Sequence, residues 1–264
     1  MSKTGRGECM PVNIGITERG DAALNDDWVD WVYNKDLPAI LITKNVIALE
    51  NKHPDIFTKN VIVHITCTGL GGTILEPNVP DYKSILQWIQ NQPATIKRKV
   101  VLRCDPLCPT LFEINNEKFD GNKYGNAIRE IFTVIEQEKI RCRISFLDMY
   151  NHVRSRFEKL GIPVSNKYSN IEYNSIHLPL KYRQEFLEVL KMIAPTTFIE
   201  ICGEPGLTCT GCLSKLDLDI LGMEPMDLSK GQQRLACQCL GIKKELLNNK
   251  HPCAHNCAYC YWKD

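Results

Sequence analysis

Residues 60–68 read NVIVHITCT, a short run dominated by valine and isoleucine that ends on threonine and cysteine. The run is too short for a buried helix and rich in β-branched residues, so it predicts a buried strand. Similar runs lie at residues 12–18, 39–44, 99–105, 142–150 and 197–204. Stretches of helical period separate most of them, at residues 24–34, 81–92, 122–139, 152–161 and 181–194. This alternation predicts an α/β fold, a partial or complete (β/α) barrel of TIM-like type.

Each predicted strand finishes on polar residues, and these ends indicate where a site would lie. The polar residues are Glu18 and Arg19; Thr43, Lys44 and Asn45; Thr66 and Thr68; Arg103 and Asp105; Asp148 and Tyr150; and Glu200 and Glu204. For any one of them, a cap or a salt bridge is the better interpretation. Because the carboxyl ends of parallel barrel strands meet at one face, however, six such ends together predict a ligand-binding mouth.

Composition and charge limit the class of protein. The chain has 264 residues, of which 44% are apolar and 24% are charged, enough for one large domain with or without an appendage. Its net charge of +1 provides no electrostatic footprint for nucleic acid or membrane surfaces. We find neither an apolar leader segment nor a run near the ~20 residues of a membrane helix. We therefore expect a cytoplasmic protein without a membrane partner.

The strand–helix alternation stops near residue 201, which is the predicted boundary. Residues 1–201 are expected to form the βα-barrel domain. Residues 202–264 are expected to form a cysteine-rich iron-sulfur segment packed on the barrel mouth, because they contain too few large apolar side chains to fold alone.

The cysteines gather in this last segment. Of thirteen in the chain, eight follow residue 201: Cys202, Cys209, Cys212, Cys237, Cys239, Cys253, Cys257 and Cys260. In a chain without an export signal these should be reduced thiols, which indicates metal ligation or redox chemistry rather than disulfides. Cys104 and Cys108 also have C-x3-C spacing but lack a third cysteine, and we expect them to be buried thiols.

The last cysteines have the spacing C-x3-C-x2-C, with Tyr259 directly before the third. Three such thiolates can hold a 4Fe-4S cluster and leave one iron without a protein ligand, where S-adenosylmethionine (SAM) binds in radical SAM enzymes. The alternative is zinc, with His251 or His255 as the fourth ligand. Structural zinc sites usually show a second C-x2-C pair, which is missing here, so we favour iron and sulfide.

The earlier cysteines can supply a second site. Four of them would complete another iron-sulfur cluster or a structural zinc site. The pair Cys209 and Cys212 in CTGC is also compatible with a redox role, although no thioredoxin-like context surrounds it. Glu204 lies in CGEPG, which looks like the GGEP stretch of radical SAM enzymes, but it precedes the tail cysteines instead of following them.

Several segments together resemble a known family almost from end to end. They are LITKN, HITCTGLGGTILEPNVP, VVLRCDPL, ISFLDMY, ICGEPGLTCTGCL, KGQQRLACQC and CAHNCAYCY. They are similar to a widespread bacterial family catalogued as a domain of unknown function, which carries a radical-SAM-type cysteine cluster at its carboxyl terminus. That arrangement looks like a circular permutation of the radical SAM order.

The resemblance implies roles for individual residues. Cys253, Cys257 and Cys260 match the cluster motif, and the family's other recurring cysteines match Cys202, Cys212, Cys237 and Cys239. Cys209 is left over. Where the family has an Arg-Arg-Thr-Asp stretch after its first strand, this chain has ERGD at residues 18–21. Arg19 and Asp21 are retained, and we expect both to line the mouth and bind cofactor.

The leading hypothesis is a radical SAM-like iron-sulfur enzyme that cleaves SAM reductively and acts on an unknown small or nucleotide-like substrate. Its partners would be that substrate and an electron donor such as a flavodoxin or ferredoxin. We expect Arg103, Asp105 and Asp148 in catalysis, Lys44 and Glu204 in positioning SAM, and a second iron-sulfur cluster on the earlier cysteines. The alternatives are a non-catalytic zinc or iron-sulfur protein and a nucleic-acid repair or modification enzyme, although the near-neutral charge argues against duplex binding.

Overall fold

The computed structural model describes residues 13–169, 176–223, 231, 236–247 and 253–261. Seven strands form one sheet in the order β6-β5-β4-β3-β2-β1-β7, and every neighbouring pair is parallel. The strands are β1 (Ile14–Ile16), β2 (Ala39–Thr43), β3 (Val61–Thr66), β4 (Val100–Leu107), β5 (Arg141–Phe146), β6 (Ile199–Ile201) and β7 (Lys243–Glu245). The predicted α/β class with a parallel sheet is confirmed, and each of the six predicted runs contains a strand.

The last strand, β7, was not predicted. Its sequence Lys-Lys-Glu has no apolar residue, so no local pattern marks it as a strand. It forms because it pairs with β1 at the sheet edge, in the register Ile14 to Lys243 and Ile16 to Glu245. The segment after residue 201 therefore contributes a strand to the same sheet as the preceding residues.

The helices lie between the strands, and most follow the predicted stretches. They are α1 (Val46–Lys52), α2 (Tyr82–Asn91), α3 (Ala94–Lys97), α4 (Gly121–Glu138), α5 (Asn151–Lys159), α6 (Leu180–Ile193) and α7 (Lys215–Ile220), with 3-10 turns η2 (Ile56–Thr58), η3 (Pro109–Glu113) and η4 (Asn166–Ser169). The predicted helix at 24–34 is wrong for most of its length. Only a π-turn, η1 (Asp30–Asn34), forms there, and the indole of Trp28 is buried and donates to the carbonyl of Ala22.

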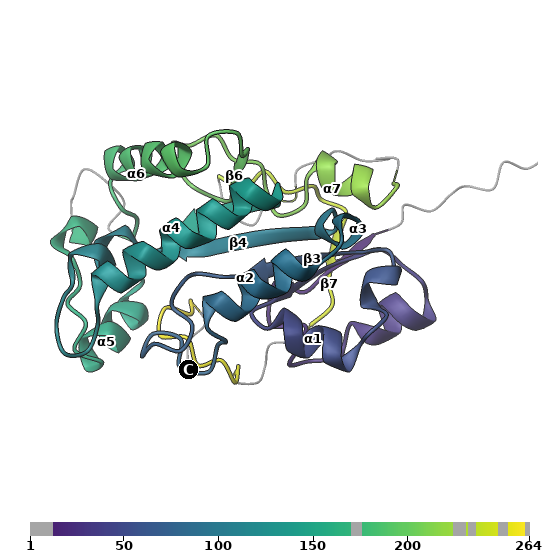
Figure 1. Ribbon diagram of the computed structural model, residues 1–264, viewed down its shortest axis with the longest axis horizontal. Coiled ribbons are helices and arrows are strands. Elements are labelled where there is room, and N and C mark those ends of the chain that lie inside the picture. The colour runs from purple at the N-terminus through teal and green to yellow at the C-terminus, as the bar shows by residue number, and fades with distance from the viewer. Residues whose placement is uncertain (1–12, 170–175, 224–230, 232–235, 248–252, 262–264) are drawn as a thin grey trace, which may run out of the picture.

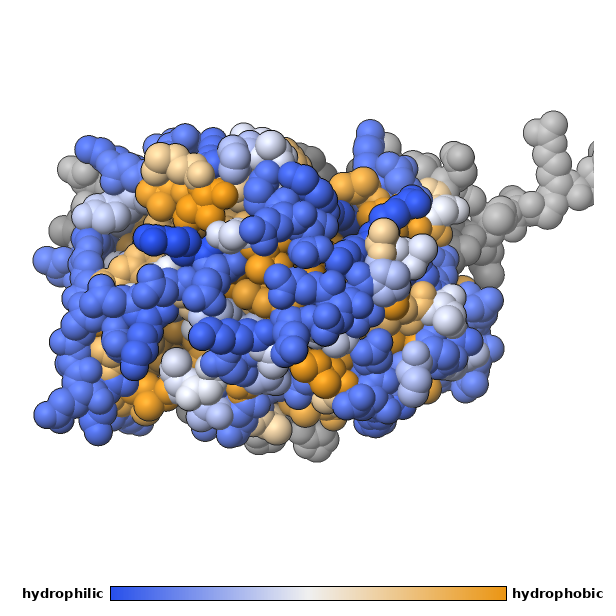
Figure 2. Space-filling model, in the orientation of Figure 1, coloured by the Kyte–Doolittle hydropathy of each residue, from blue (hydrophilic) through white to orange (hydrophobic). Residues whose placement is uncertain are grey.

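One face of the sheet packs against α2 and α4, which lie in front of β3 and β4 in Figure 1. Alternate strand residues such as Val63 and Leu102 point to these helices. The predicted stripe on α4 is confirmed as core, since its members are at most 3% exposed: Ile128, Ile131, Phe132 and Ile135. Figure 2 shows that the outer surface of this helical layer is mainly hydrophilic with small hydrophobic patches, as amphipathic helices require.

The opposite face of the sheet is covered by residues from the cysteine-rich segment. The strand residues that alternate with those facing α2 and α4 pack on this opposite face: Ile14, Ile16, Ile40, Ile62 and Val101. Their partners in the segment are Cys212, Leu213, Leu218, Leu221, Cys237, Cys239 and Leu240. This second apolar cluster brings distant cysteines onto the sheet.

Within the described ranges, we see no helix with the length and apolar character needed to cross a membrane.

Candidate metal centre

The last described residues, 253–261, lie against loops at the carboxyl ends of the strands. The amide of Ala258 donates to the carbonyl of Leu75 at 3.0 Å, and Asn78 donates to the carbonyl of Ala254 at 2.7 Å, both from the loop after β3. Arg156 of α5 donates to the carbonyl of Cys260 at 2.6 Å. These backbone contacts hold the loop that carries Cys253, Cys257 and Cys260 at the end of the sheet where the polar residues were predicted to converge.

A buried ion pair fixes the start of this loop. His255 Nε2 lies 2.7 Å from Asp21 Oδ2, and both side chains are about 95% buried. Asp21 also accepts hydrogen bonds from the Thr43 hydroxyl and the Lys44 amide, each at 2.7 Å. Burial alone would raise the pKa of Asp21, but the hydrogen bond and charge of His255, with these other donors, hold it below its ordinary value. Asp21 is therefore an anion that ties the tail to the ends of β1 and β2.

A second polar group fixes the end of the loop. Lys44 Nζ lies 2.7 Å from Glu76 Oε1 and 2.6 Å from the Tyr259 hydroxyl, which itself donates to Glu76. Thr68 donates to the other oxygen of Glu76 at 2.7 Å. Burial would lower the pKa of Lys44, but the charges of Glu76, Cys257 and Asp105 raise it overall. Lys44 is therefore an ammonium group beside the tail cysteines.

The predicted residues Arg103 and Asp105 form the next group. Arg103 and Ser145 both donate to Asp105, where the pairing of β4 with β5 becomes irregular between Cys104 and Leu107. Burial favours the neutral carboxyl, but the charges of Arg103 and Lys44 and the Ser145 hydrogen bond lower the pKa of Asp105. Arg103 Nε is buried and has no hydrogen-bond partner within the described ranges. The pair thus retains one N–H donor that can bond to another group.

Two of the earlier cysteines, Cys202 and Cys212, interact with Arg103. Burial would lower the pKa of Arg103, but Asp105, Cys212 and Cys202 raise it, which places both thiols within its electrostatic reach. The sulfurs of Cys202 and Cys212 are 3.0 Å apart, and the Cys212 amide donates to Cys239 Sγ at 3.0 Å. The Cys239 amide in turn donates to Cys237 Sγ at 3.5 Å.

The four cysteines implied by the resemblance thus lie together, with Cys202 and Cys212 in electrostatic reach of Arg103. Cys209 contacts the Glu204 amide at 3.2 Å instead. The structure therefore contains two thiol groups, which we call the tail set (Cys253, Cys257 and Cys260) and the second set (Cys202, Cys212, Cys237 and Cys239).

The tail set suits a cluster better than a single ion. Burial raises the pKa of Cys257 to about 12, while Lys44 opposes the shift and the other two tail thiols add to it, so the three thiols interact. Among the described residues, the one group of three or more ligand side chains with all ligand atoms within 4.8 Å is Glu18, Cys212 and Cys239. At least one pair of tail sulfurs therefore lies more than 4.8 Å apart, farther than the roughly 3.8 Å between sulfurs on one tetrahedral zinc ion. In a 4Fe-4S cluster each thiolate binds a different iron, so wider spacing fits.

His255 does not fit the alternative role of a fourth zinc ligand. Its Nε2 faces Asp21, and its Nδ1 lies 3.3 Å from the carbonyl oxygen of Asn78. Both ring nitrogens therefore have partners from the body of the protein. His251, the other candidate, lies outside the described residues.

Three of the predicted site residues belong to other surroundings. Glu204 accepts from the Phe146 amide at 2.7 Å and from Arg183 at 2.8 Å, and burial raises its pKa. Asp148 pairs with His177 Nδ1 at 2.6 Å. Arg19 is exposed in the loop after β1. The structure thus brings Lys44, Asp21, Arg103 and Asp105 together with the tail, whereas Glu204 and Asp148 form a separate group at the ends of β5 and β6.

The sequence reasoning missed two residues of this site, Glu76 and Ser145, and assigned Tyr259 only to the motif. Glu76 is 1% exposed, although it lies in a loop. Its flanks, Leu75 and Pro77, form an apolar and rigid context for an acid. That context is the one local signal that could have identified it.

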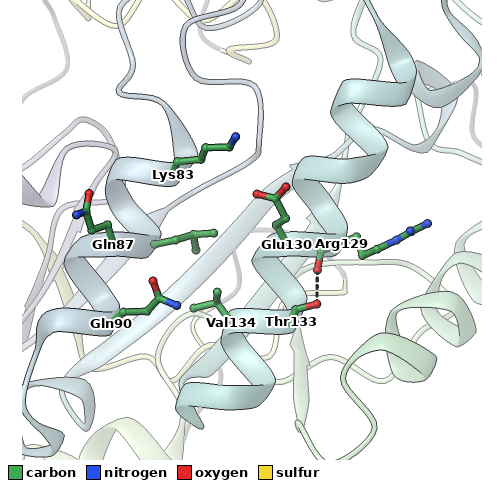
Figure 3. Close-up of a pocket in the computed structure, with 8 residues that line it drawn as sticks. Lys83, Gln87, Gln90, Arg129, Glu130, Thr133 and Val134 are labelled. Carbon is green, nitrogen blue, oxygen red and sulfur yellow. Dashed lines mark hydrogen bonds between the residues drawn. The ribbon is translucent and has the colours of Figure 1, made fainter.

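A shallow groove lies elsewhere, between α2 and α4 on the helical layer. Its volume is about 360 Å³. Figure 3 shows Lys83 and Gln90 on one helix extending toward the helix that carries Glu130 and Val134. These residues lie on the outside of the sheet's helical layer, away from both thiol sets, and we do not assign the groove a role.

One family model matches this chain. It is described as a domain of unknown function (DUF1848), and the match covers residues 32–262, which include both thiol sets. Searches of curated proteins and of solved structures find no match.

Proposed function

This chain belongs to the DUF1848 family of unknown function, as the sequence resemblance predicted, and we propose that it is a radical SAM-type enzyme with a 4Fe-4S cluster on its tail set. The coarser statement, that its many cysteines are compatible with metal binding, rests on the family match and on the convergence of ligand side chains. The observation that carries the finer proposal is the position of the tail set beside Lys44, between the ends of β1, β2, β3 and the start of α5.

The donor set supports this assignment. Cys253, Cys257 and Cys260 would hold the cluster, and three ligands leave one iron without a protein donor. When bound, such a cluster supplies the electron that cleaves SAM reductively to a carbon radical and methionine. Cys253 is exposed and the other two thiols are half-buried, so SAM and an electron donor such as a flavodoxin or ferredoxin can approach.

The charged residues beside the tail suit the amino-acid part of SAM. Lys44 and Arg103 are cations that can bind a carboxylate, while Asp105 lies between them and can bind an amine. Asp21 and His255 would keep the cluster loop in place during binding. The unpaired Nε of Arg103 offers a donor to a substrate polar group.

The strand order also supports the proposal. Strands β1 to β6 follow one another across the sheet in chain order, which is the order of a βα barrel. We propose that the sheet is part of such a barrel, with residues 202–264 covering its mouth. Barrel enzymes place their active sites at the carboxyl ends of the strands.

A non-catalytic metal protein is the second candidate. The ion pairs of Lys44 with Glu76 and of Arg103 with Asp105 occupy the polar groups of the mouth with internal partners. A structural metal that holds the tail to the sheet would not require any of these polar groups to bind a substrate.

Anaerobic reconstitution separates the two candidates. Protein supplied with iron and sulfide, and then reduced in the presence of SAM, is expected to release 5'-deoxyadenosine. The Cys257→Ala variant should lose this activity, while Cys209→Ala, which removes a thiol outside both sets, should keep it. An intact cluster in the wild type without any SAM cleavage would establish the structural role and reject the enzyme.

A further inference from the structure

Three ligand atoms from distant segments converge on the sheet face that lies opposite α2 and α4. They belong to Glu18 after β1, Cys212 after β6 and Cys239 before β7, and all lie within 4.8 Å of one another. The two thiols are 6% and 1% exposed, and Glu18 is half-buried. A partly buried carboxylate needs a cationic partner, which a basic side chain, a metal ion or both can provide.

The backbone brings these residues together. On β1, Ile14 and Ile16 point to the face that Cys212 and Cys239 cover, and Glu18 continues this alternation past the strand end. Gly211 adopts a positive φ of +79°, and a Cβ there would lie 2.6 Å from the Cys239 amide nitrogen. The close approach lets the Cys212 amide donate to Cys239 Sγ at 3.0 Å. Amide donors to sulfur stabilise a thiolate, so this pairing prepares Cys239 to bind a cation.

Lys243 of β7 completes the surroundings. Its Nζ lies 3.0 and 2.8 Å from the two oxygens of Glu18, whose amide donates to Glu245 at 3.0 Å. A carboxylate has about four lone-pair sites, so an ion pair leaves room for a metal. Two thiolates and one carboxylate carry three negative charges, and a divalent cation together with Lys243 carries three positive charges. The site is therefore neutral when it holds one divalent ion.

We propose that Glu18, Cys212 and Cys239 bind a single zinc ion. Thiolate and carboxylate are both zinc ligands, and ligand atoms on one tetrahedral ion lie about 3.8 Å apart or less, which the observed grouping can reach with small shifts. Cys202, whose sulfur is 3.0 Å from that of Cys212, can supply a fourth ligand after a shift toward the other two. The proposal concerns the second set and does not depend on the chemistry proposed for the tail.

The test uses the full chain with Cys253, Cys257 and Cys260 replaced by alanine, so that only the second set can bind metal. We expect this protein to hold one zinc ion per chain by elemental analysis, without acid-labile sulfide. Its zinc affinity is measured by competition with a chromophoric chelator. The Glu18→Gln substitution, made in this background, should weaken zinc binding by at least about 10-fold, the smaller of the losses seen when groups around metal ligands are removed.

Lys243→Gln is the matched control. It breaks the same ion pair and removes one positive charge but leaves the carboxylate, so zinc affinity should fall clearly less than in Glu18→Gln. Equal losses in the two variants would mean that Glu18 acts only through its ion pair, and unchanged affinity in Glu18→Gln would exclude it as a ligand. Acid-labile sulfide in the parent would overturn the single-ion assignment.

Cobalt gives a readout that folding differences do not mimic. Co²⁺ in the parent should show the visible bands of a tetrahedral site with thiolate charge transfer. The bands should shift in Glu18→Gln and stay in place in Lys243→Gln, and a spectrum identical in all three proteins would contradict ligation by Glu18. Circular dichroism confirms that each variant is folded. Because the tail thiols are absent, failure of this test is distinct from failure of the radical SAM proposal.

Discussion

At the scale of single residues, His64 shows how burial lowers the pKa of a side chain on the sheet face that packs against the cysteine-rich segment. It is fully buried on β3, with Nε2 3.5 Å from Arg143 Nη1. Its Nδ1 has no hydrogen-bond partner among the described residues. Burial, followed by the charges of Arg143, Arg103 and Arg141, lowers the pKa of His64 well below 6.5. The folded protein therefore keeps this histidine neutral near these three arginines.

This shift predicts an acid-sensitive stability. Well above pH 6.5, His64 is neutral in both the folded and the unfolded protein, so it does not contribute to the pH dependence of the free energy of unfolding. Below pH 6.5 the unfolded chain gains a proton that the folded chain does not, so the free energy of unfolding falls by up to about 1.4 kcal/mol per pH unit. Urea denaturation of His64→Gln between pH 8 and 5 should show a weaker pH dependence than the wild type. Parallel curves for the two proteins would contradict the assigned protonation state.

At the scale of elements, the loop after β3 is shaped by a close backbone approach. A Cβ on Gly71 would lie 2.0 Å from the carbonyl oxygen of Pro80. Gly71 also bridges to Glu76, and the Gly72 amide donates to the Glu76 carbonyl at 3.0 Å. The loop thus presents the Glu76 carboxylate to Lys44 and Tyr259 only while its two ends stay in contact.

Gly71→Ala should therefore disturb the site as well as the stability. The clash forces the loop open, and the free energy of unfolding should fall by about 1–3 kcal/mol, the usual cost of overpacking. Hydrogen exchange at the Ala258 amide, which bonds to Leu75 of the same loop, should become faster. Gly125→Ala in α4 is the control, since the nearest atom to its Cβ is 3.8 Å away and alanine favours helix by roughly 1 kcal/mol. A variant Gly71→Ala as stable as the wild type would mean that the loop adapts.

At the scale of the whole molecule, the two thiol sets interact with different charged residues. Lys44 is within electrostatic reach of Cys257, and Arg103 is within electrostatic reach of Cys202 and Cys212. The tail set is held by loops after β1, β2 and β3, while the second set lies on the sheet face opposite α2 and α4. The cluster proposed for the tail set and the zinc ion proposed for the second set would therefore be two separate centres.

Anaerobic metal analysis should therefore resolve two centres. The wild type is expected to contain iron and sulfide together with zinc. The Cys253→Ala, Cys257→Ala, Cys260→Ala variant should lose iron and sulfide and keep zinc, because the second set is untouched. The Cys212→Ala, Cys239→Ala variant should show the reverse. Loss of both metals in either variant, with the fold intact by circular dichroism, would mean that the two sets form one centre.

Much of the fold could be predicted because its signals are local. The run NVIVHITCT predicts a strand, and the stripe of Ile128, Ile131 and Phe132 predicts a helix, each from a few neighbouring residues. The strand β7 could not be predicted, because Lys243, Lys244 and Glu245 are extended only through their pairing with β1. The same applies to the helix expected at 24–34, where the burial of Trp28 took precedence over helical periodicity.

For the candidate site, the sequence by itself determined the kinds of ligand: the thiols of both sets, and the ions Lys44, Arg103, Asp105 and Asp21 at strand ends. Only the tertiary structure decided which of them meet. Asp21 and His255 are 234 residues apart, Glu18 and Lys243 are 225 apart, and Glu76 and Tyr259 are 183 apart. Sequence patterns report on neighbours within one or two turns, whereas these contacts arise because the parallel sheet gathers its strand ends and the tail folds back over them.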